Sequence, residues 1–195
     1  MAQLEDIKKL RAQTQVGIST AREALDASHG DFEKAIQYLK KMGLDKQAKK
    51  SDREMSQGYI GSYVHGNGKI GVIVEVVCET DFVSNTEEFK TFCKDIALQI
   101  AGMNPKFVSR EDISDENRKL LEEKAMEEID VKGKSEQIIE SIKLGKLQKV
   151  YEELVLLDQV YLKDETKKVS ELLSESVLKF GENIKIRKFS RFQLE

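Results

Sequence analysis

The residues of this chain that could do covalent or metal chemistry are few and far apart. The 195 residues include two histidines, His29 and His65, and two cysteines, Cys78 and Cys93. A zinc or iron site needs several nitrogen, sulfur or carboxylate donors at compatible spacing, and neither histidine has them nearby in the sequence. We interpret both histidines as surface turn residues and Cys93 as a packed thiol on an apolar helix face. No metal ligand and no cofactor is predicted.

Acidic and glycine-rich motifs do not point to catalysis either. The pairs Glu122–Glu123 and Glu152–Glu153 are adjacent on highly charged segments, and adjacent helical residues do not face one another. The glycines at 66–69 have the wrong spacing from lysine for a phosphate-binding loop. No nucleophile elbow or nucleotide fingerprint is present. The sequence therefore favours a binding protein without catalytic residues over an enzyme.

One stretch, residues 78–85, has the features of a surface that meets a partner. The preceding residues 70–77 are rich in β-branched residues and predict a strand, and Ser84 and Asn85 can cap a following helix. Between them lie four residues that we call the corner: Thr80, Asp81, Phe82 and Val83. On the residues alone two interpretations stay open. Phe82 either points outward as an aromatic anchor or packs inward as core.

The first 43 residues predict three short helices. Apolar residues recur at helical spacing in residues 4–14, a turn follows at Val16-Gly17, and Thr20 with Glu23 suggests a capping box for a second helix. Asp31 can cap a third helix, which we expect Gly43 to end. We therefore predict a compact helical module over 1–43 and a solvated linker over 44–56.

Residues 57–195 predict a mixed core. Two strands over 57–65 and 69–77 flank a Gly-Asn-Gly turn, which is typical of a hairpin. One helix is expected to end at Gly102, and another to cover 114–128. A pair of helices (135–144 and 147–157) is expected around Gly145. After a connector over 158–164, a last helix is expected to end at Gly181. Alternating residues 184–194 predict a third strand. The fold class is α+β: a three-helix module, then an antiparallel sheet of at least three strands packed with helices.

Composition sets further limits on location and partners. The hydrophobic fraction of 39% and charged fraction of 34% describe a folded, helix-rich chain, and no apolar run approaches ~18 residues. We expect a cytoplasmic protein that does not bind membranes. Because the net charge is −3, we also expect no direct binding of nucleic acid. Residues 1–50 carry ten Lys/Arg and seven Asp/Glu, so a basic head precedes an acidic body. This asymmetry suggests an acidic partner, or simply a solvated helical face.

Four stretches carry a resemblance to a known family. They are residues 10–25 (LRAQTQVGISTAREAL), 74–83 (VEVVCETDFV), 99–105 (QIAGMNP), and 156–164 (LLDQVYLKD) with the ending 187–192. Over nearly its whole length the chain resembles bacterial elongation factor Ts, the guanine-nucleotide exchange factor for elongation factor Tu, in its short form. Residues 1–43 resemble a ubiquitin-associated domain. The chain departs from the family pattern at Gln15, Ile18, Ser19 and Val160, where a glycine, two methionines and a proline are usual.

The resemblance implies a mechanism and a set of partner-binding residues. The corner would insert into the nucleotide domain of elongation factor Tu, where Phe82 would wedge between helices and Asp81 would hold the displaced backbone. Mg²⁺ would then lose its ligands and GDP would leave. Arg11 and Ile18 would dock the N-terminal module on the same partner domain; for Arg11 the alternative of a solvated surface residue stays open.

Longer members of the family carry two related core halves, and only one hairpin-and-helix unit is evident here. A homodimer would supply the second half. Two other functions remain open: a ubiquitin-associated adaptor or nascent-chain-binding protein, which would explain only residues 1–43, and an unrecognised enzyme.

Overall fold

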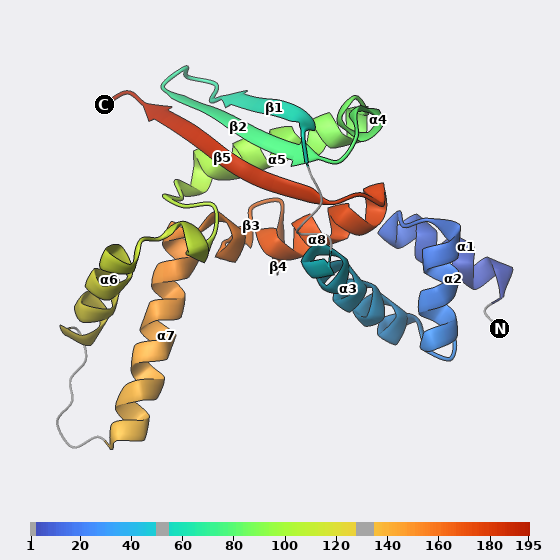
Figure 1. Cartoon of the computed structure of the whole chain (residues 1–195), viewed down its shortest axis with the longest axis horizontal. Helices are drawn as coiled ribbons and strands as arrows, with labels where there is room; N and C mark the ends of the chain where they lie inside the picture. Colours follow the sequence, from blue (N-terminus) through green and yellow to red (C-terminus); the bar gives the residue numbers. More distant parts are fainter. Residues whose placement is uncertain (1–2, 50–54, 128–134) are drawn as a thin grey trace.

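The chain folds into three N-terminal helices followed by an antiparallel sheet packed with helices (Figure 1). The computed structural model describes residues 3–49, 55–127 and 135–195. The predicted α+β class is confirmed.

The N-terminal helices are α1 (Leu4–Thr14), α2 (Ile18–Ala27) and α3 (Phe32–Lys49). Asp31 caps α3 as predicted, because its carboxylate accepts a hydrogen bond of 3.0 Å from the backbone N–H of Lys34. The helix α2 begins one turn earlier than the Thr20 capping box suggested. The helices enclose their own apolar core, built from Ile7, Leu10, Val16, Ala21, Ala24, Leu25, Ala35 and Leu39.

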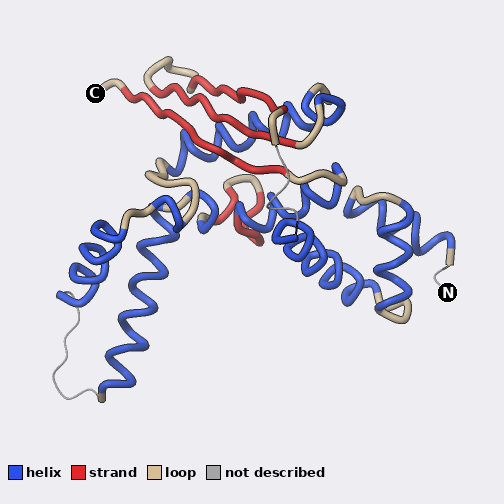
Figure 2. The backbone as a smooth tube through the Cα atoms, viewed as in Figure 1, coloured by secondary structure: helices blue, strands red, loops and turns tan. Residues whose placement is uncertain are grey.

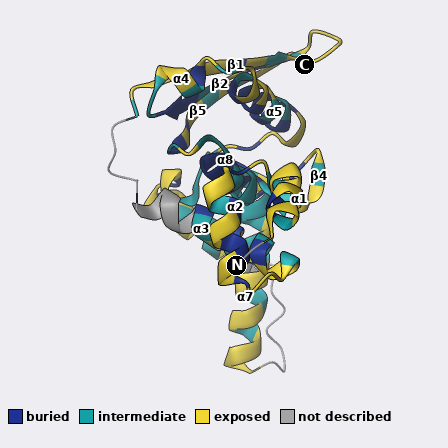
Figure 3. Ribbon diagram, turned by 90° about the vertical axis from the view of Figure 1, so that its right-hand side faces the viewer, coloured by how far each residue is buried: buried dark blue, intermediate teal, exposed yellow. Residues whose placement is uncertain are grey.

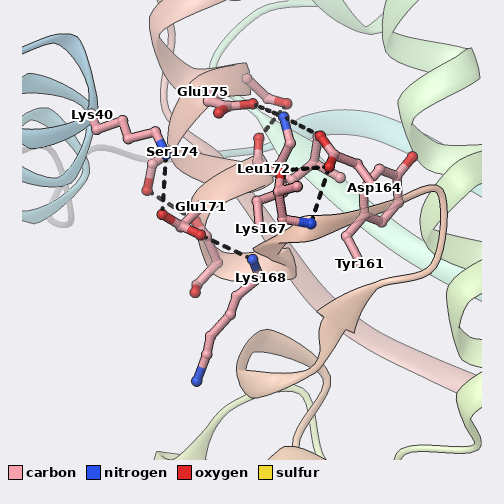
Figure 4. Close-up of polar contacts among 12 residues, drawn as sticks. Lys40, Tyr161, Asp164, Lys167, Lys168, Glu171, Leu172, Ser174 and Glu175 are labelled. Carbon is pink, nitrogen blue, oxygen red and sulfur yellow. Dashed lines mark hydrogen bonds and ion pairs between the residues drawn. The ribbon is translucent and has the colours of Figure 1, made fainter. Parts of the chain in front are cut away.

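The prediction that Gly43 ends the third helix is wrong. Gly43 lies inside α3, where it faces α8 (Val169–Phe180), and a Cβ built on it would lie 2.8 Å from the carbonyl oxygen of Ser174. The absent side chain therefore allows two helix backbones to approach closely. Leu178 of α8 completes the apolar core of the module. Lys40 and Glu171 form an ion pair of 3.6 Å across the same contact, as Figure 4 shows.

The predicted linker over 44–56 begins as a continuation of the helix that makes this contact. Residues 44–49 continue α3, and residues 50–54 lie outside the described residues. The division into 1–43, 44–56 and 57–195 stays a prediction.

The sheet has three antiparallel strands, β1 (Gln57–Val64), β2 (Ile70–Cys78) and β5 (Ile184–Gln193), in the order β1-β2-β5 (Figure 2). The predicted hairpin and the predicted C-terminal strand are both confirmed. Gly68 adopts a left-handed conformation with φ of 70°, which a residue without a side chain reaches at little cost. The central strand β2 is thus bonded on both edges, once to its neighbour in sequence and once to the end of the chain.

One face of the sheet carries the main core. The helices α5 (Glu87–Met103) and α8 cover it (Figure 3). Every second position of β2 from Val72 to Cys78 is buried in the same cluster. The buried set includes Val72, Val74, Val76, Cys78, Phe89, Phe92, Cys93, Ile96, Ile100, Val169, Leu173, Val177, Ile184 and Ile186.

The opposite face of the sheet is open to solvent over most of its length, and Val77, near the end of β2, is buried on it. The strand register places Ile60, Val64, Ile73 and Phe192 on this face, because their cross-strand partners alternate with the buried positions. All four are exposed. We call these four residues the open sheet face.

The helices α6 (Asp115–Glu127) and α7 (Glu136–Leu154) form an arm that points away from the sheet (Figure 1). The expected pair of helices around Gly145 is wrong, since α7 runs through it unbroken. Arg110, in the 3₁₀ turn Arg110–Asp112, binds both carboxylate oxygens of Asp158, in the turn Leu156–Asp158, at 2.8 Å. Its guanidinium also lies 4.4 Å from the ring centre of Tyr151 on α7. These contacts fix the base of the arm to the core.

The expected connector over 158–164 is partly wrong, because it contributes to a small hairpin of β3 (Val160–Tyr161) and β4 (Asp164–Lys168). Two buried amides attach this hairpin to α5. Gln99 donates to Gln159 at 3.2 Å and to the carbonyl of Val160 at 3.0 Å, and it accepts from the backbone of Leu162 at 2.8 Å. Because buried amides need partners, this network fixes the hairpin at one place on α5.

Candidate partner-binding site

Three of the four corner residues, Asp81, Phe82 and Val83, lie in a single helical turn, and Thr80 precedes it. The strand β2 ends at Cys78, and α4 (Asp81–Ser84) follows directly. The helix α5 begins after a separate cap: Thr86 accepts from the backbone N–H of Phe89 at 3.2 Å. The expectation that Ser84 and Asn85 cap this helix is therefore wrong by one to two residues.

The four corner residues differ in what surrounds them. Phe82 is 85% exposed, and Asp81 is also exposed. Val83 is half-buried and packs against the main core. The buried hydroxyl of Ser84, next in the chain, donates to the carbonyl of Asp81 at 3.2 Å. The turn is therefore anchored by its third and fourth residues, and of the two interpretations of Phe82 the outward one describes this structure.

Thr80 is held from within the protein. Its backbone N–H and its hydroxyl donate to the two carboxylate oxygens of Glu182, at 3.0 and 2.5 Å. In the reverse direction, the backbone N–H of Asn183 donates to Glu79 at 2.9 Å. Gly181 ends α8 in a left-handed conformation with φ of 74° and so directs the chain toward this contact.

Glu182 is a residue that reasoning from the sequence missed. It lies 102 positions from Thr80, and only its place directly after a helix-ending glycine distinguishes it in the sequence. Contacts over such separations leave no local pattern.

The thiol of Cys78 also contacts the corner. It donates to the carbonyl of Thr80 at 3.2 Å. Burial raises the pKa of this thiol, and the nearby charge of Glu182 raises it further. Burial likewise raises the pKa of Cys93 to about 12. Both thiols are therefore protonated near neutral pH and serve as packed apolar groups.

Arg11 and Ile18 flank the turn between α1 and α2. The guanidinium of Arg11 donates to the carbonyl of Val16 at 3.3 Å, and its own carbonyl accepts from Gln15 at 2.8 Å. Gln15 ends α1 at a positive φ of 58°, a conformation that a glycine reaches more easily. Ile18, the first residue of α2, is 52% exposed. The side chain of Arg11 thus makes one hydrogen bond within the chain and is exposed, and Ile18 is open to solvent.

The N-terminal turn and the corner belong to neighbouring parts of the fold. Gln13, Thr14 and Gln15 at the end of α1 line a crevice of about 270 Å³ together with Glu88 and Thr91, near the start of α5. The start of α5 directly follows α4. The structure therefore brings the end of α1 close to the start of α5, the helix that follows the corner.

The remaining candidates from the sequence have ordinary surroundings. His29 sits in the turn between α2 and α3 at a φ of 52°, and His65 contacts the hydroxyl of Tyr63 at 3.2 Å. Among residues 3–49, 55–127 and 135–195, no three His, Cys, Asp or Glu gather as metal ligands would. No helix in this part of the chain is long and apolar enough to span a membrane.

Comparison with known proteins decides the family. The family model described as "Elongation factor TS" matches residues 3–195. The chain belongs to the elongation factor Ts family. An elongation factor Ts from Caldanaerobacter subterraneus is 45% identical over 197 residues, covering 99% of this chain and 96% of that relative. The one from Thermodesulfovibrio yellowstonii is 48% identical over 189 residues, covering 96% and 94%.

The match extends over both parts of the chain. The elongation factor Ts of Syntrophomonas wolfei is 43% identical over 198 residues and covers 100% of this chain and 91% of its own. The helical module and the α+β core are therefore both part of the elongation factor Ts pattern. This rules against an account based on residues 1–43 alone.

Proposed function

We propose that this chain binds elongation factor Tu carrying GDP and accelerates the release of GDP, so that GTP can bind in its place. The observation that carries the proposal is Phe82, a large apolar side chain that is 85% exposed on a turn fixed to the core. A rigid aromatic residue presented in this way loses little entropy on binding, and such residues often dominate the energy of an interface.

The corner supplies two kinds of contact for the partner. Phe82 would insert between helices of the partner's nucleotide domain and displace one of them. The exposed carboxylate of Asp81 would bind the backbone groups that this movement leaves unpaired. Val83 faces the core of this chain, and it would act by holding the turn in place.

The release of GDP is explained by the ligand geometry that Mg²⁺ requires in the partner. Mg²⁺ requires near-ideal octahedral oxygen geometry at about 2.0–2.1 Å, so a small displacement of a supporting element weakens its binding strongly. GDP then loses its counter-ion and dissociates. The coupling is reciprocal, so nucleotide that rebinds must weaken the hold of the exchange factor by the same factor.

The N-terminal module would provide a second contact. Arg11 and Ile18 lie at a turn whose neighbouring helix end shares a crevice with the start of α5. A partner bound to the corner could therefore meet this turn at the same time. Once one of the two contacts has formed, the second forms within the same complex, so together they bind more tightly than either contact alone.

The direct test is the release of a fluorescent GDP analogue from elongation factor Tu. We expect release to accelerate as this chain is added and to saturate with its concentration. Release that stays at the rate of elongation factor Tu alone would overturn the proposal. Since the partner acts in translation, we also propose a cytoplasmic location, testable by fractionation of cells.

We further propose that the chain works as a homodimer joined through the open sheet face. Ile60, Val64, Ile73 and Phe192 expose apolar area on a sheet whose other face is already covered. Two such faces related by a two-fold axis are self-complementary, and stacked sheets pack about 10 Å apart. A dimer would also provide the second core half that longer family members contain. A mass of one chain in light scattering at working concentration would exclude it.

A further inference from the structure

All the backbone and hydroxyl groups of Thr80 are bound inside the protein. Glu182 accepts from its N–H and its hydroxyl, at 3.0 and 2.5 Å. The carbonyl of Thr80 accepts from the thiol of Cys78 at 3.2 Å and from the backbone N–H of Ser84 at 3.4 Å. Thr80 thus has its polar groups turned toward its own chain, while Phe82, two residues later, has its side chain in solvent.

We propose that Glu182 is a positioning residue for exchange: by holding Thr80 it fixes the direction in which the corner presents Phe82. This inference rests on the proposed function, and it assigns a role to a residue outside the corner and remote from it in sequence. The half-buried carboxylate binds the first residue of the turn through two hydrogen bonds to a charged acceptor, which are stronger than neutral ones.

A helical turn of four residues cannot hold its shape alone. Helix nucleation fixes several dihedral angles for a single hydrogen bond, so short isolated helices are unstable in water. At its far end α4 is fixed by buried Ser84 and by Thr86, whose hydroxyl donates to the carbonyl of Val83 at 2.8 Å. At its near end α4 is fixed chiefly by the two charge-assisted bonds to Glu182, beside the weaker bond from the thiol of Cys78. Without Glu182, the partner would have to order the turn on binding, at a cost in affinity.

The chain offers conservative variants that separate this role from simple packing. Glu182→Ala removes both acceptors. Glu182→Gln keeps two bonds, because the amide oxygen can accept from the N–H of Thr80 while its NH₂ donates to the hydroxyl, which turns from donor to acceptor. Thr80→Val removes the hydroxyl and keeps the shape, and Thr80→Ser keeps the hydroxyl. Glu175→Ala is the matched control: it removes a half-buried glutamate of α8 that pairs with Lys167 at 2.7 Å.

The first measurement needs no partner. Hydrogen exchange of the amides of Ser84 and Asn85 reports on α4, since they bond to the carbonyls of Thr80 and Asp81. We expect these amides to exchange at least about tenfold faster in Glu182→Ala, because the loss of one charge-assisted hydrogen bond already corresponds to about tenfold and this variant removes two. The amide of Val74, in the buried centre of β2, should keep its rate, as should both regions in the Glu175→Ala control.

The second measurement uses elongation factor Tu and the fluorescent GDP analogue. If the Glu182 contact sets the population of the correctly oriented corner, and Glu182→Ala leaves that population at about a tenth, the affinity falls to about a tenth. We therefore expect the concentration of Glu182→Ala that gives half-maximal release to rise about tenfold, while the maximal rate stays near that of the unaltered chain. In Glu182→Gln and Thr80→Ser the half-maximal concentration should lie close to that of the unaltered chain. Glu182→Ala and Thr80→Val should not be additive, because the one hydrogen bond that Thr80→Val removes is among the two that Glu182→Ala removes.

Each outcome decides a separate point. Unchanged exchange of Ser84 and Asn85 in Glu182→Ala would overturn the inference, and so would faster exchange without any rise in the half-maximal concentration. Additive effects of the Thr80 and Glu182 variants would also overturn it, since Thr80 would then act directly on the partner. If the unaltered chain fails to accelerate GDP release, the proposed function is overturned, while hydrogen exchange still shows whether Glu182 holds the turn.

Discussion

Phe82 and Phe89 lie seven residues apart on consecutive helices, yet Phe82 is 85% exposed and Phe89 is 0% exposed. Phe89 packs in the main core, where its ring meets that of Phe180 edge-on with centres 5.7 Å apart. The same residue type thus has two roles in one short segment, one in stability and one on the surface.

This difference gives the first prediction. Phe82→Ala should leave the free energy of unfolding within about 0.5 kcal/mol of the unaltered chain, because an exposed side chain loses few contacts. It should reduce stimulated GDP release by at least about tenfold, as expected for a central interface residue. Urea unfolding and nucleotide release measure the two effects. Phe89→Ala is the control and should lose about 3–5 kcal/mol of stability. A collapse of folding in Phe82→Ala would instead make Phe82 a core residue.

The second prediction concerns the docking of the helical module. In Gly43→Ala the new methyl group would lie 2.8 Å from the carbonyl of Ser174, so the backbones of α3 and α8 must separate. We expect a loss of about 1–3 kcal/mol, typical of overpacking. Gly145→Ala is the matched control, since Gly145 is exposed within α7 and a Cβ there meets nothing within 4 Å. That variant should gain about 0.5–1 kcal/mol from helix propensity. Equal effects of the two changes in urea unfolding would contradict the close helix contact.

The third prediction tests the open sheet face. Ile73→Lys places a charge at the centre of the proposed dimer interface and should shift the mass in light scattering to that of one chain. Ile138→Lys on α7 is the matched control: Ile138 is 51% exposed and Ile73 is 50% exposed. Loss of the dimer in both variants, or in neither, would argue against this face as the interface.

The fourth prediction follows from the buried thiols. The pKa of Cys93 is raised from an ordinary value of 9.0 to about 12, so the folded protein favours the neutral thiol more than the unfolded chain does. The resulting stability is complete below about pH 9 and is lost as the pH rises from about 9 to about 12. Urea unfolding at about pH 8 and about pH 11 measures this loss, which should be smaller in Cys93→Ala. A thiol reagent that labels native Cys93 rapidly near pH 8 would contradict it.

The elements that could be predicted are those with a strong local pattern. The turn at Gly66-Asn67-Gly68 and the alternation in β2 specify the hairpin, and the alternation in β5 specifies a third strand. Features set by distant contacts could not be predicted. Gly43 reads as a helix end until the carbonyl of Ser174 is placed beside it. The charged strand β4 has no apolar alternation, and it depends on a hairpin held by Gln99.

The candidate site divides in the same way. The corner is visible in the sequence, because an apolar strand stops abruptly before Thr80 and a helix with acidic first residues follows. The outward direction of Phe82 is not visible there, since it depends on Val83 and Ser84 packing inward. Glu182 is not visible either, because its partner lies 102 residues away.

The separation between Thr80 and Glu182 also sets the order of events during synthesis of the chain. Ribosomes add roughly 5–20 residues per second, so Glu182 follows Thr80 after roughly 5–20 s. During that time β2 lacks its pairing with β5, and the turn that carries Phe82 lacks its near-end contact. A chain that stops before Glu182 has the complete Thr80–Val83 sequence without the contact that orients it. In terms of the proposed function, a product that ends before Glu182 is therefore expected to bind the partner more weakly than a chain that contains it.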